Sequence, residues 1–405
     1  MAYNYDKSAL KGLGVGAFLG EVKTRNAKIA EAPDTMPESI FNSNRLAAAL
    51  HPKAQYAVVS KVIDRGDAKS FVLVPDKEQG TEKLAYFRAG QFVSVLLRIS
   101  ELAVSKPYSL QSGPKDALGE WSSYTITVRS SRSGFASEYI LTNWKEGSHV
   151  TLSGPLGNFY YTDLRDAKKV VALAGGSGIT PFFSMASAIV DGIEDFDLTI
   201  LYGSRTEDTI LLKDELESLC VRSKGRVKLV HVLSDEEREG YEHGFLTAEL
   251  IRKYAPEGDY SIFLCGPGAF YDYMDTQLPA LEKPIRRVRR ELYGERKTPE
   301  TLPDYPAEAA GKTFTLRVKD KTKSYELTCR AGQSLLNAME LSGIHAPADC
   351  RSGECGWCHS RLISGEVYVP EAADGRRSAD VKFGWVHPCC TFPLSDVELE
   401  IFTLY

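Results

Sequence analysis

Long hydrophobic runs and an excess of positive charge are both missing from this chain of 405 residues. A membrane-spanning helix needs about 20 mainly apolar residues, so we expect no membrane span. The formal net charge of −5 argues against the strongly basic surfaces that bind nucleic acids, and we expect no nucleic-acid partner. The first residues lack the apolar region and the small-residue cleavage site of a secretory signal. The sequence therefore predicts a cytoplasmic protein.

Histidine is also scarce, since the chain has seven residues of this type and they are scattered. We find no persuasive Ser/His/Asp set and no carboxylate pair that would point to hydrolytic catalysis. Cysteine is sparse along most of the chain, but five of the eight cysteines lie within the last 56 residues. In a long chain without an export signal, clustered thiols are more typical of metal ligands or catalytic groups than of disulfides.

The hydrophobic pattern divides the first three quarters of the chain into three segments. Residues 1–51 form an extension without a strong β pattern, and one short predicted helix in it ends before Pro52. Residues 52–164 contain short runs of β-branched and aromatic residues separated by Gly, Pro and Ser, which indicate a small antiparallel barrel or sandwich. Residues 165–293 alternate apolar strands with segments of helix length, which indicates a doubly wound parallel sheet.

Two further segments complete the chain. Residues 294–311 contain three prolines and little apolar content, which is typical of a linker. Residues 312–405 are predicted to form a hairpin, a helix, a cysteine-rich loop and a final strand. The expected fold class is therefore multidomain, with α+β and α/β parts.

The cysteine-rich loop "DCRSGECGWC" carries the clearest chemical signal. Cys350, Cys355 and Cys358 follow the pattern C-x4-C-x2-C, which is the ligand spacing of plant-type [2Fe–2S] clusters. Gly353 and Gly356 lie between these cysteines, where the backbone must bend tightly and bring its N–H groups close to the sulfur atoms. The sequence therefore predicts an iron–sulfur site in this loop.

A fourth ligand is expected downstream, in "HPCCTFPLSD", where Cys389 and Cys390 are both candidates. A zinc site would favour a second C-x2-C pair, which is missing here. A Rieske centre would replace two cysteines by histidines, and His359 and His387 do not reproduce that arrangement. The residues alone leave the choice between the two cysteines open.

A second signal lies in "VVALAGGSGITPFFSM", where an apolar strand leads through glycines into a helix. Backbone N–H groups and a helix dipole can cradle a phosphate in such a turn. The spacing departs from G-x-G-x-x-G because Pro181 occupies the place of the third glycine. A tight strand-to-helix turn without a ligand is the alternative interpretation of this motif.

The segment from 312 to the end resembles the plant-type ferredoxin domain, which has a β-grasp fold. Hairpin, helix, "DCRSGECGWC" and a final "CxxxPxSDxxxE" occur here in the order of that family. In related reductases the last ligand precedes the proline of this tail by four residues. Counted back from Pro393, the resemblance implies that Cys389 is the fourth cluster ligand together with Cys350, Cys355 and Cys358.

Upstream, "GGSGITP" and "FLCGPGAFYDYM" resemble the nicotinamide domain of the ferredoxin-NADP reductase superfamily. The resemblance implies that the glycine-rich turn lies along the dinucleotide and that the CGP turn lies beside the nicotinamide. The residues it implies are Gly175, Gly176, Gly178 and Thr180 in the first motif and Cys265, Gly266 and Pro267 in the second. At the end of this domain, the resemblance also places Glu291 and Tyr293 against a flavin.

The preceding barrel resembles the flavin domain of the same superfamily. "SKPYSL" stands where the family has R-x-Y-S/T, and "SGPLGNF" matches the G-P-x-G-x-F turn that closes the barrel. "GFAS" matches the family's G-x-x-S turn, so Gly134 and Ser137 would approach the flavin phosphates. This turn usually serves a pyrophosphate, which favours FAD over FMN.

The "SKPYSL" motif supplies the flavin contacts that the resemblance implies, from Lys106, Pro107, Tyr108 and Ser109. Tyr108 would pack on the isoalloxazine, and Ser109 would hydrogen-bond near its reactive nitrogen. Ser109 and Cys265 are thus the residues expected to serve hydride transfer. Lys106 replaces the family's arginine and loses its bidentate fork, so flavin is expected to be held less tightly.

The choice between NADH and NADPH depends on the residues at the ribose 2′ position. NADPH-specific relatives place Ser-Arg after the strand equivalent to "KLVHVLSD", whereas Ser234 is followed here by Asp235. A carboxylate repels a phosphate and accepts from a ribose hydroxyl. Arg205 in "YGSRTED" argues the other way. The sequence favours NADH, with NADPH as the alternative.

The order of flavin barrel, nicotinamide domain and ferredoxin is that of the reductase components of bacterial oxygenase systems. The resemblance implies an oxidoreductase that takes hydride from NADH onto FAD and passes single electrons to a [2Fe–2S] cluster. The acceptor would be a protein such as an oxygenase or another iron enzyme. The alternatives are a diaphorase or quinone-type reductase and a non-catalytic redox-sensing module. For residues 1–51, an extra helix packed on the barrel is expected, with a docking element as the alternative.

Overall fold

The N-terminal extension forms a unit of its own, residues 1–48, apart from residues 49–405 in the computed structural model. The structure describes residues 16–31, 41–100, 102–130, 135–292, 294, 298–321 and 323–402. Helices α1 (Gly16–Glu31) and α2 (Asn42–Leu50) belong to the extension and its end, and α2 confirms the helix predicted before Pro52. All side chains of α2 are exposed, and the packing of this helix on the barrel stays a prediction. Among the described residues, every helix is too short or too polar to cross a bilayer.

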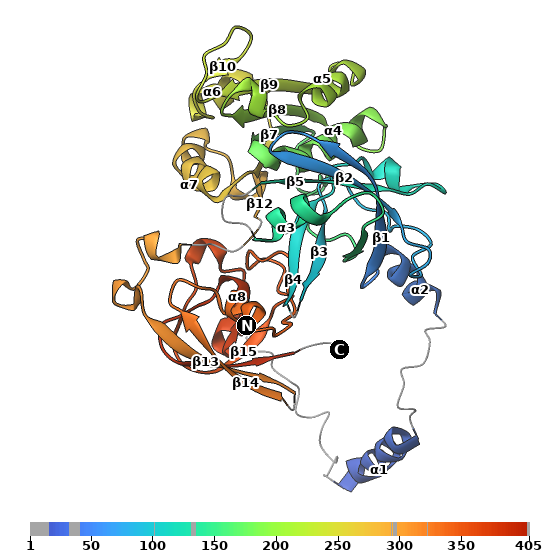
Figure 1. Cartoon of the computed structure of the whole chain (residues 1–405), viewed down its shortest axis with the longest axis vertical. Coiled ribbons are helices and arrows are strands. Elements are labelled where there is room, and N and C mark those ends of the chain that lie inside the picture. The colour runs from blue at the N-terminus through green and yellow to red at the C-terminus, as the bar shows by residue number, and fades with distance from the viewer. Residues whose placement is uncertain are drawn as a thin grey trace. The chain divides into compact units, whose positions relative to one another are not determined.

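The segment predicted as a barrel forms a six-stranded antiparallel sheet in the order β4-β3-β6-β1-β2-β5 (Figure 1). Its elements are β1 (Gln55–Asp64), β2 (Ala68–Pro75), β3 (Phe92–Ile99), β4 (Leu102–Ser109), β5 (Tyr124–Arg129), helix α3 (Phe135–Asn143) and β6 (His149–Leu152). Alternate residues such as Phe71 and Leu73 point into one core, as the period of a half-buried strand requires. The two edge strands β4 and β5 come into contact, and the Gln111 N–H donates to the Thr125 carbonyl at 2.8 Å. This contact curls the sheet into a barrel.

Strand β4 is absent from the strands that the sequence pattern predicts. The segment "LAVSKPYS" is interrupted by Pro107 and by polar residues, which lowers its resemblance to a strand. Proline is tolerated at a sheet edge because its missing N–H is not needed there, and β4 is the edge strand next to β3.

The segment predicted as a doubly wound domain forms a parallel six-stranded sheet in the order β10-β9-β8-β7-β11-β12. The strands are β7 (Lys169–Gly175), β8 (Asp197–Ser204), β9 (Val227–Leu233), β10 (Glu242–His243), β11 (Ser261–Cys265) and β12 (Val288–Glu291). The helices are α4 (Thr180–Val190), α5 (Lys213–Arg222), α6 (Ala248–Tyr254) and α7 (Gly268–Gln277). The chain adds β8 and β9 on one side of β7 and β11 and β12 on the other. The order of the strands therefore reverses between β7 and β11, where doubly wound sheets bind ligands.

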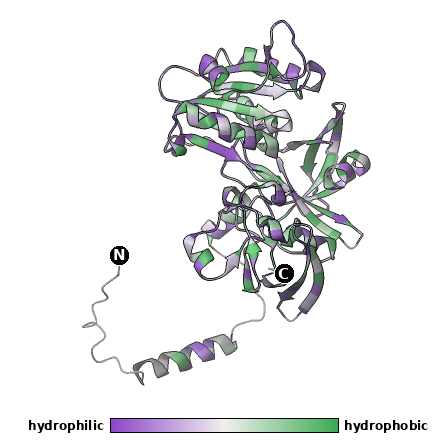
Figure 2. Cartoon of the chain, turned by 90° about the vertical axis from the view of Figure 1, so that its left-hand side faces the viewer, coloured by the Kyte–Doolittle hydropathy of each residue, from purple (hydrophilic) through white to green (hydrophobic). Residues whose placement is uncertain are grey.

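Both faces of this sheet are buried. Val170 and Ala172 of β7 belong to a core shared with α4 and α5, whereas Val171 and Leu173 belong to a core shared with α6 and α7. Figure 1 shows the two pairs of helices on opposite sides of the strands. In Figure 2 hydrophobic residues are concentrated on the strands of this sheet, as expected for parallel strands covered on both faces.

The basic run at residues 286–290 takes part in the fold. Strand β12 (Val288–Glu291) overlaps this run. Arg289 is buried and its guanidinium forms an ion pair of 2.9 Å with the buried Asp166. It also donates to the carbonyls of Asn158 and Tyr160. Arg289 therefore joins the sheet edge to the turn that closes the barrel.

The C-terminal segment forms a five-stranded sheet in the order β14-β13-β19-β15-β17 and a separate pair, β16-β18. The strands are β13 (Thr313–Asp320), β14 (Lys323–Arg330), β15 (Ser360–Ser364), β16 (Val367–Tyr368), β17 (Trp385–Val386), β18 (Phe392–Pro393) and β19 (Val397–Ile401), and the helices are α8 (Leu335–Leu341) and α9 (Ser378–Lys382). Ser334 caps α8 by accepting from the Asn337 N–H at 3.1 Å. Leu336 and Met339 of α8 pack against the sheet, so the sheet wraps around one helix as in a β-grasp fold.

The predicted linker, residues 294–311, is packed in its described part. It carries short 3₁₀ turns at Pro299–Thr301 and Ala307–Ala309. Tyr305 is buried against Tyr368 and Phe392 of the C-terminal domain. Leu302 and Ala309 of the same segment belong to this cluster, so a few apolar side chains among prolines and charged residues are enough to pack the segment.

Candidate redox site

The glycine-rich turn and the CGP turn lie side by side at the point where the strand order reverses. Strand β7 ends at Gly175, continues through a 3₁₀ turn (Gly176–Ile179) and enters α4 at Thr180. The neighbouring strand β11 ends at Cys265, which is paired with Ala174. Because parallel strands end at the same edge, the two predicted dinucleotide motifs meet there, at the position where doubly wound sheets bind ligands in a crevice.

Glycine residues, which have no side chain, allow the glycine-rich turn and the CGP turn to approach each other closely. A Cβ atom on Gly178 would lie 2.1 Å from the Cys265 carbonyl oxygen, so only glycine fits there. A Cβ atom on Gly266 would lie 2.6 Å from the ring of Phe270. Gly176 has a φ of +53°, a left-handed conformation that glycine adopts at little cost. The glycines thus serve the packing of one turn on the other.

Two helices begin at this crevice. Thr180 is the first residue of α4, and its hydroxyl donates to the Ser177 carbonyl at 3.1 Å. Pro267 directly precedes α7. Both helix N-termini therefore face the same edge of the sheet, and the positive ends of their dipoles favour an anionic group such as a pyrophosphate.

Cys265 is buried next to an acidic residue. Its register partner on β12 is Glu291, which is also buried. Burial and the charge of Glu291 raise the pKa of the Cys265 thiol well above its usual value. The thiol therefore stays neutral and presents a small, polarisable surface rather than a charge. Tyr271 supports this corner, because the Gly266 N–H donates to its hydroxyl and that hydroxyl donates to the Glu291 carbonyl.

The predicted flavin strand is β4. Lys106 and Tyr108 alternate along it with Pro107 and Ser109, so the two pairs point to opposite faces of the strand. Burial raises the pKa of the Tyr108 hydroxyl to about 12, which keeps it neutral. Its oxygen lies 3.5 Å from the hydroxyl of Ser137 in the first turn of α3.

Two of the predicted residues, Gly134 and Tyr293, lie outside the described residues. Arg129 at the end of β5 was not predicted. Its guanidinium would contact a Cβ atom on Gly176 at 3.3 Å, and Asp67 holds it in place at 2.7 Å. The barrel therefore reaches the glycine-rich turn through a cation, which no local motif indicates.

At the far end of the crevice, the loops after β8 and β9 are joined through their backbones. The Asp235 N–H donates to the Arg205 carbonyl at 2.9 Å, and both side chains are exposed. Ser234 donates to the Asp235 carboxylate at 2.6 Å. The structure thus brings together the two residues predicted to face the ribose.

The cysteine thiols lie in two pairs. The Cys355 N–H points at the Cys350 sulfur atom at 3.4 Å, which joins these two residues, and the Sγ atoms of Cys358 and Cys389 are 3.4 Å apart. In the parts of the chain that the structure describes, no three Cys, His, Asp or Glu side chains form a site for a single metal ion. Two pairs fit the two iron ions of a [2Fe–2S] cluster, with two cysteines for each.

The loop also supplies N–H groups to the sulfur atoms. The Ser352 and Cys355 N–H groups each lie 3.4 Å from the Cys350 sulfur. Gly353 and Gly356 have φ values of +88° and +70°, which produces the tight bends expected from the sequence. Hydrogen bonds, first from the Cys355 thiol and then from Ser352, lower the pKa of the Cys350 thiol. N–H groups directed at a sulfur atom stabilise the thiolate form in which cysteine binds a cluster.

Cys389 and Cys390 occupy different environments. Cys390 is buried, and its thiol donates to the His387 carbonyl at 3.4 Å. A Cβ atom on Gly353 would lie 2.8 Å from the Cys390 sulfur, so Cys390 packs behind the loop. Cys389 instead faces Cys358. This geometry supports the choice of Cys389.

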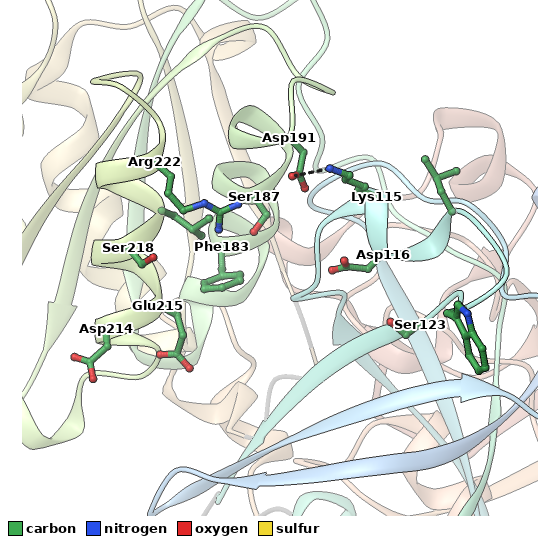
Figure 3. Close-up of a pocket in the computed structure, with 13 residues that line it drawn as sticks. Lys115, Asp116, Ser123, Phe183, Ser187, Asp191, Asp214, Glu215, Ser218 and Arg222 are labelled. Atoms are coloured by element: carbon green, nitrogen blue, oxygen red, sulfur yellow. Dashed lines mark hydrogen bonds and ion pairs between the residues drawn. The ribbon is translucent and has the colours of Figure 1, made fainter.

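A cavity of about 830 Å³ opens elsewhere, between the loop after β4 and helices α4 and α5 (Figure 3). Lys115 and Asp191 face each other across it at 3.5 Å. Its lining has four carboxylates and two cations and includes none of the predicted site residues. Such a lining does not attract an anionic dinucleotide, so the crevice at the strand ends remains the candidate site.

Three family models match the chain in order. They describe an oxidoreductase FAD-binding domain at residues 58–161, an oxidoreductase NAD-binding domain at 172–276 and a 2Fe-2S iron–sulfur cluster binding domain at 318–394. The ferredoxin reductase component of 3-ketosteroid-9-alpha-monooxygenase from Mycobacterium tuberculosis is 30% identical over 353 residues, which cover 84% of this chain and 93% of that protein. The chain belongs to this family of FAD-, NAD- and 2Fe-2S-binding ferredoxin reductases.

Two other similar proteins also match this reductase over most of both chains. The glycine betaine monooxygenase reductase subunit of Chromohalobacter salexigens is 26% identical over 377 residues, covering 90% of this chain and 100% of that protein. A solved structure of phthalate dioxygenase reductase has 24% identity and a TM-score of 0.59, and the match covers 86% of this chain and 98% of that one. The predicted fold class and the three predicted cofactor-binding domains are confirmed.

Proposed function

We propose that this reductase takes electrons from NADH and delivers them, through FAD and the [2Fe–2S] cluster, to an oxygenase. The observation that carries the proposal is the placement of four cysteines: the Cys355 N–H lies at the Cys350 sulfur atom, and the sulfur atoms of Cys358 and Cys389 are 3.4 Å apart. The names of the two relatives, both reductase components of monooxygenases, support an oxygenase as the acceptor. All eight cysteines are free thiols, which supports a reducing compartment such as the cytoplasm.

The cofactors supply the redox chemistry: a nicotinamide gives two electrons as hydride, a flavin accepts them and releases them singly, and a cluster carries one at a time. The chain's own residues bind and orient. We assign flavin binding to Lys106, Pro107, Tyr108, Ser109, Gly134 and Ser137, with Tyr293 beside the flavin. We assign dinucleotide binding to Gly175, Gly176, Gly178, Thr180, Arg205, Asp235, Cys265, Gly266 and Pro267. The domain boundaries expected from the sequence, 52–164, 165–293 and 312–405, belong to this proposal.

Anaerobic stopped-flow absorbance tests the proposal directly. Mixing the purified protein with NADH should bleach the flavin first and then reduce the cluster, and EPR of the product should show a rhombic [2Fe–2S] signal. Bleaching without a cluster signal would contradict the electron path. Reduction of the purified oxygenase partner at a rate no faster than that of small dyes would contradict the proposed acceptor.

The preference for NADH is supported by the charges around the ribose end. Arg238 is held by Glu207 at 2.5 Å and by Glu236 at 3.3 Å, and Lys213 is held by the same Glu207. These cations are neutralised in ion pairs and do not provide a phosphate site. Asp235 presents an exposed carboxylate in the same region, which repels a 2′-phosphate.

We therefore expect Asp235→Asn to raise kcat/KM for NADPH, relative to NADH, by about five- to tenfold. Two unit charges at 4 Å interact by about 1 kcal/mol in water, and 1.4 kcal/mol corresponds to a factor of ten. Steady-state kinetics of flavin reduction with both nucleotides measures the ratio. The control is Glu237→Gln, which removes an exposed carboxylate two residues away. An equal change in both variants would show a general charge effect and contradict a specific role for Asp235.

A further inference from the structure

Arg351 is a fully buried cation in the cluster loop. It directly follows Cys350, and its side chain has 0% exposure. Its two terminal nitrogens each donate to one carboxylate oxygen of Glu340 at 2.6 Å, and Glu340 on α8 is also buried. Burying such a pair costs desolvation free energy. Arg351 also has a φ of +60°, which is strained for a residue with a side chain. Arg351 thus carries both the desolvation cost of its ion pair and the strain of its backbone, which suggests that this residue has a specific role.

The same guanidinium contacts the flavin barrel. One terminal nitrogen of Arg351 donates to the carbonyl of Ser105 on β4 at 3.1 Å. This bond is not needed to hold the loop on α8, because the fork to Glu340 already does that. Arg351 therefore links three elements: the cluster loop, α8 and β4.

Two serine hydroxyls of the barrel support the same contact. Ser105 donates to the Ala348 carbonyl, and Ser94 on β3 donates to the Asp349 carbonyl at 3.2 Å. The three bonds thus reach the residues on both sides of Cys350. Each of the two hydroxyls uses a backbone carbonyl of the loop as its acceptor, so these contacts hold the main chain rather than a mobile side chain.

The contact lies next to the flavin motif. Ser105 is followed immediately by Lys106, Pro107, Tyr108 and Ser109 on the same strand. A strand is a stiff spacer with a rise of about 3.3 Å per residue. The position of the loop on Ser105 therefore fixes the distance from Cys350 to the flavin-binding residues.

We propose that Arg351, oriented by Glu340, is a positioning residue that fixes the cluster loop on strand β4 and thereby sets the separation between flavin and cluster. The inference rests on the proposed function, because it assumes that FAD lies on β4 and the cluster on Cys350. Arg351 is not one of the residues assigned to either cofactor. It acts through the backbone of Ser105.

Two variants test the proposal in the full-length holoenzyme. Arg351→Met with Glu340→Met removes the bond to Ser105 without leaving an unpaired buried charge. Ser94→Ala with Ser105→Ala removes the two hydroxyl bonds and leaves the ion pair in place. The matched control is Arg317→Met with Glu326→Met, which removes an exposed Arg–Glu pair of the same domain, 2.9 Å long.

The readouts are iron and sulfide content, the EPR spectrum of the reduced cluster, and the two stopped-flow phases after mixing with NADH. Hydrogen exchange of the backbone amides of residues 345–352 reports directly on docking. We expect normal flavin reduction in both variants, faster exchange in the loop, and electron transfer from flavin to cluster slowed at least tenfold. The rate of electron transfer between two fixed groups falls steeply as their separation grows, so a loosened loop should slow this phase. The control should match the unaltered protein in every phase.

Transfer at the unaltered rate in both variants would overturn the proposal, as would an equal slowing in the control. If Arg351→Met/Glu340→Met lost the cluster while Ser94→Ala/Ser105→Ala transferred normally, the ion pair would only build the loop and the proposal would fail. If Arg351→Met/Glu340→Met lost the cluster and Ser94→Ala/Ser105→Ala kept it but transferred electrons slowly from flavin to cluster, the docking contact would be supported. Failure of the unaltered protein to reduce its cluster would instead refute the proposed function.

Discussion

Cys389→Ser is expected to abolish the iron–sulfur cluster, whereas Cys390→Ser is expected to retain it. The Cys389 sulfur lies 3.4 Å from that of Cys358 and completes the second thiol pair. Loss of a contact that merely supports a ligand typically reduces metal affinity by about 10–100-fold, so loss of a ligand should exceed that range. Visible absorbance, iron and sulfide content and EPR measure the effect.

The neighbouring cysteine provides a closely matched control. Cys390 differs by one position in the same turn (Pro388–Cys390) and is equally buried, so a general disturbance of the fold would affect both variants. A cluster that survives in Cys389→Ser and is lost in Cys390→Ser would reverse the assignment. Loss in both would show that the turn, rather than one thiol, is required.

Gly178→Ala is expected to slow flavin reduction by NADH about 10- to 100-fold. The new Cβ atom would overlap the carbonyl oxygen of Cys265 at 2.1 Å, which forces the glycine-rich turn away from the CGP turn. Overpacking of this kind costs about 1–3 kcal/mol in stability, and a displacement of 1 Å can cost about 10²-fold in rate. Stopped-flow bleaching of the flavin at saturating NADH isolates the step.

Gly268→Ala serves as the control for this experiment. Gly268 ends the sequence CGPG that begins with Cys265, the residue that the new Cβ atom on Gly178 would meet. A Cβ atom on Gly268 would meet nothing within 4 Å. We expect a rate within about twofold of the unaltered protein, because substitutions at exposed sites rarely change stability by more than about 0.5 kcal/mol. A normal rate in Gly178→Ala would show that the two turns need not touch for hydride transfer.

Much of the fold follows from local patterns. Strands such as β7 and β11 are continuous apolar runs, and α4 begins where the glycines end, so periodicity and turn residues predict them. The cysteine spacing likewise predicts the bends at Gly353 and Gly356, because a loop that surrounds a cluster imposes its own geometry. These features depend on residues that are close in the sequence.

The residues that sequence reasoning missed have distant partners. The buried Arg289 is paired with Asp166, which is 123 positions away in the sequence. The buried Arg351 is paired with Glu340 on the neighbouring helix, and its bond to the barrel reaches Ser105, 246 positions away. Arginine is rarely buried unless it is paired, and a local pattern does not show which carboxylate or carbonyl will pair with it. Strand β4 was missed for a related reason, since Pro107 is acceptable only because the strand forms an edge.

The packing of Tyr305 against Tyr368 and Phe392 has a consequence for the ferredoxin domain as a tethered carrier. Only seven residues lie between Glu291, the end of β12, and Pro299. The eight steps of the chain from one to the other can span at most about 29 Å at 3.3–3.6 Å per step. A short tether keeps two modules at an effective concentration in the millimolar range. Electron delivery inside the molecule should therefore be independent of protein concentration, and exchange of ferredoxin domains between two molecules should be outcompeted by the domain already attached.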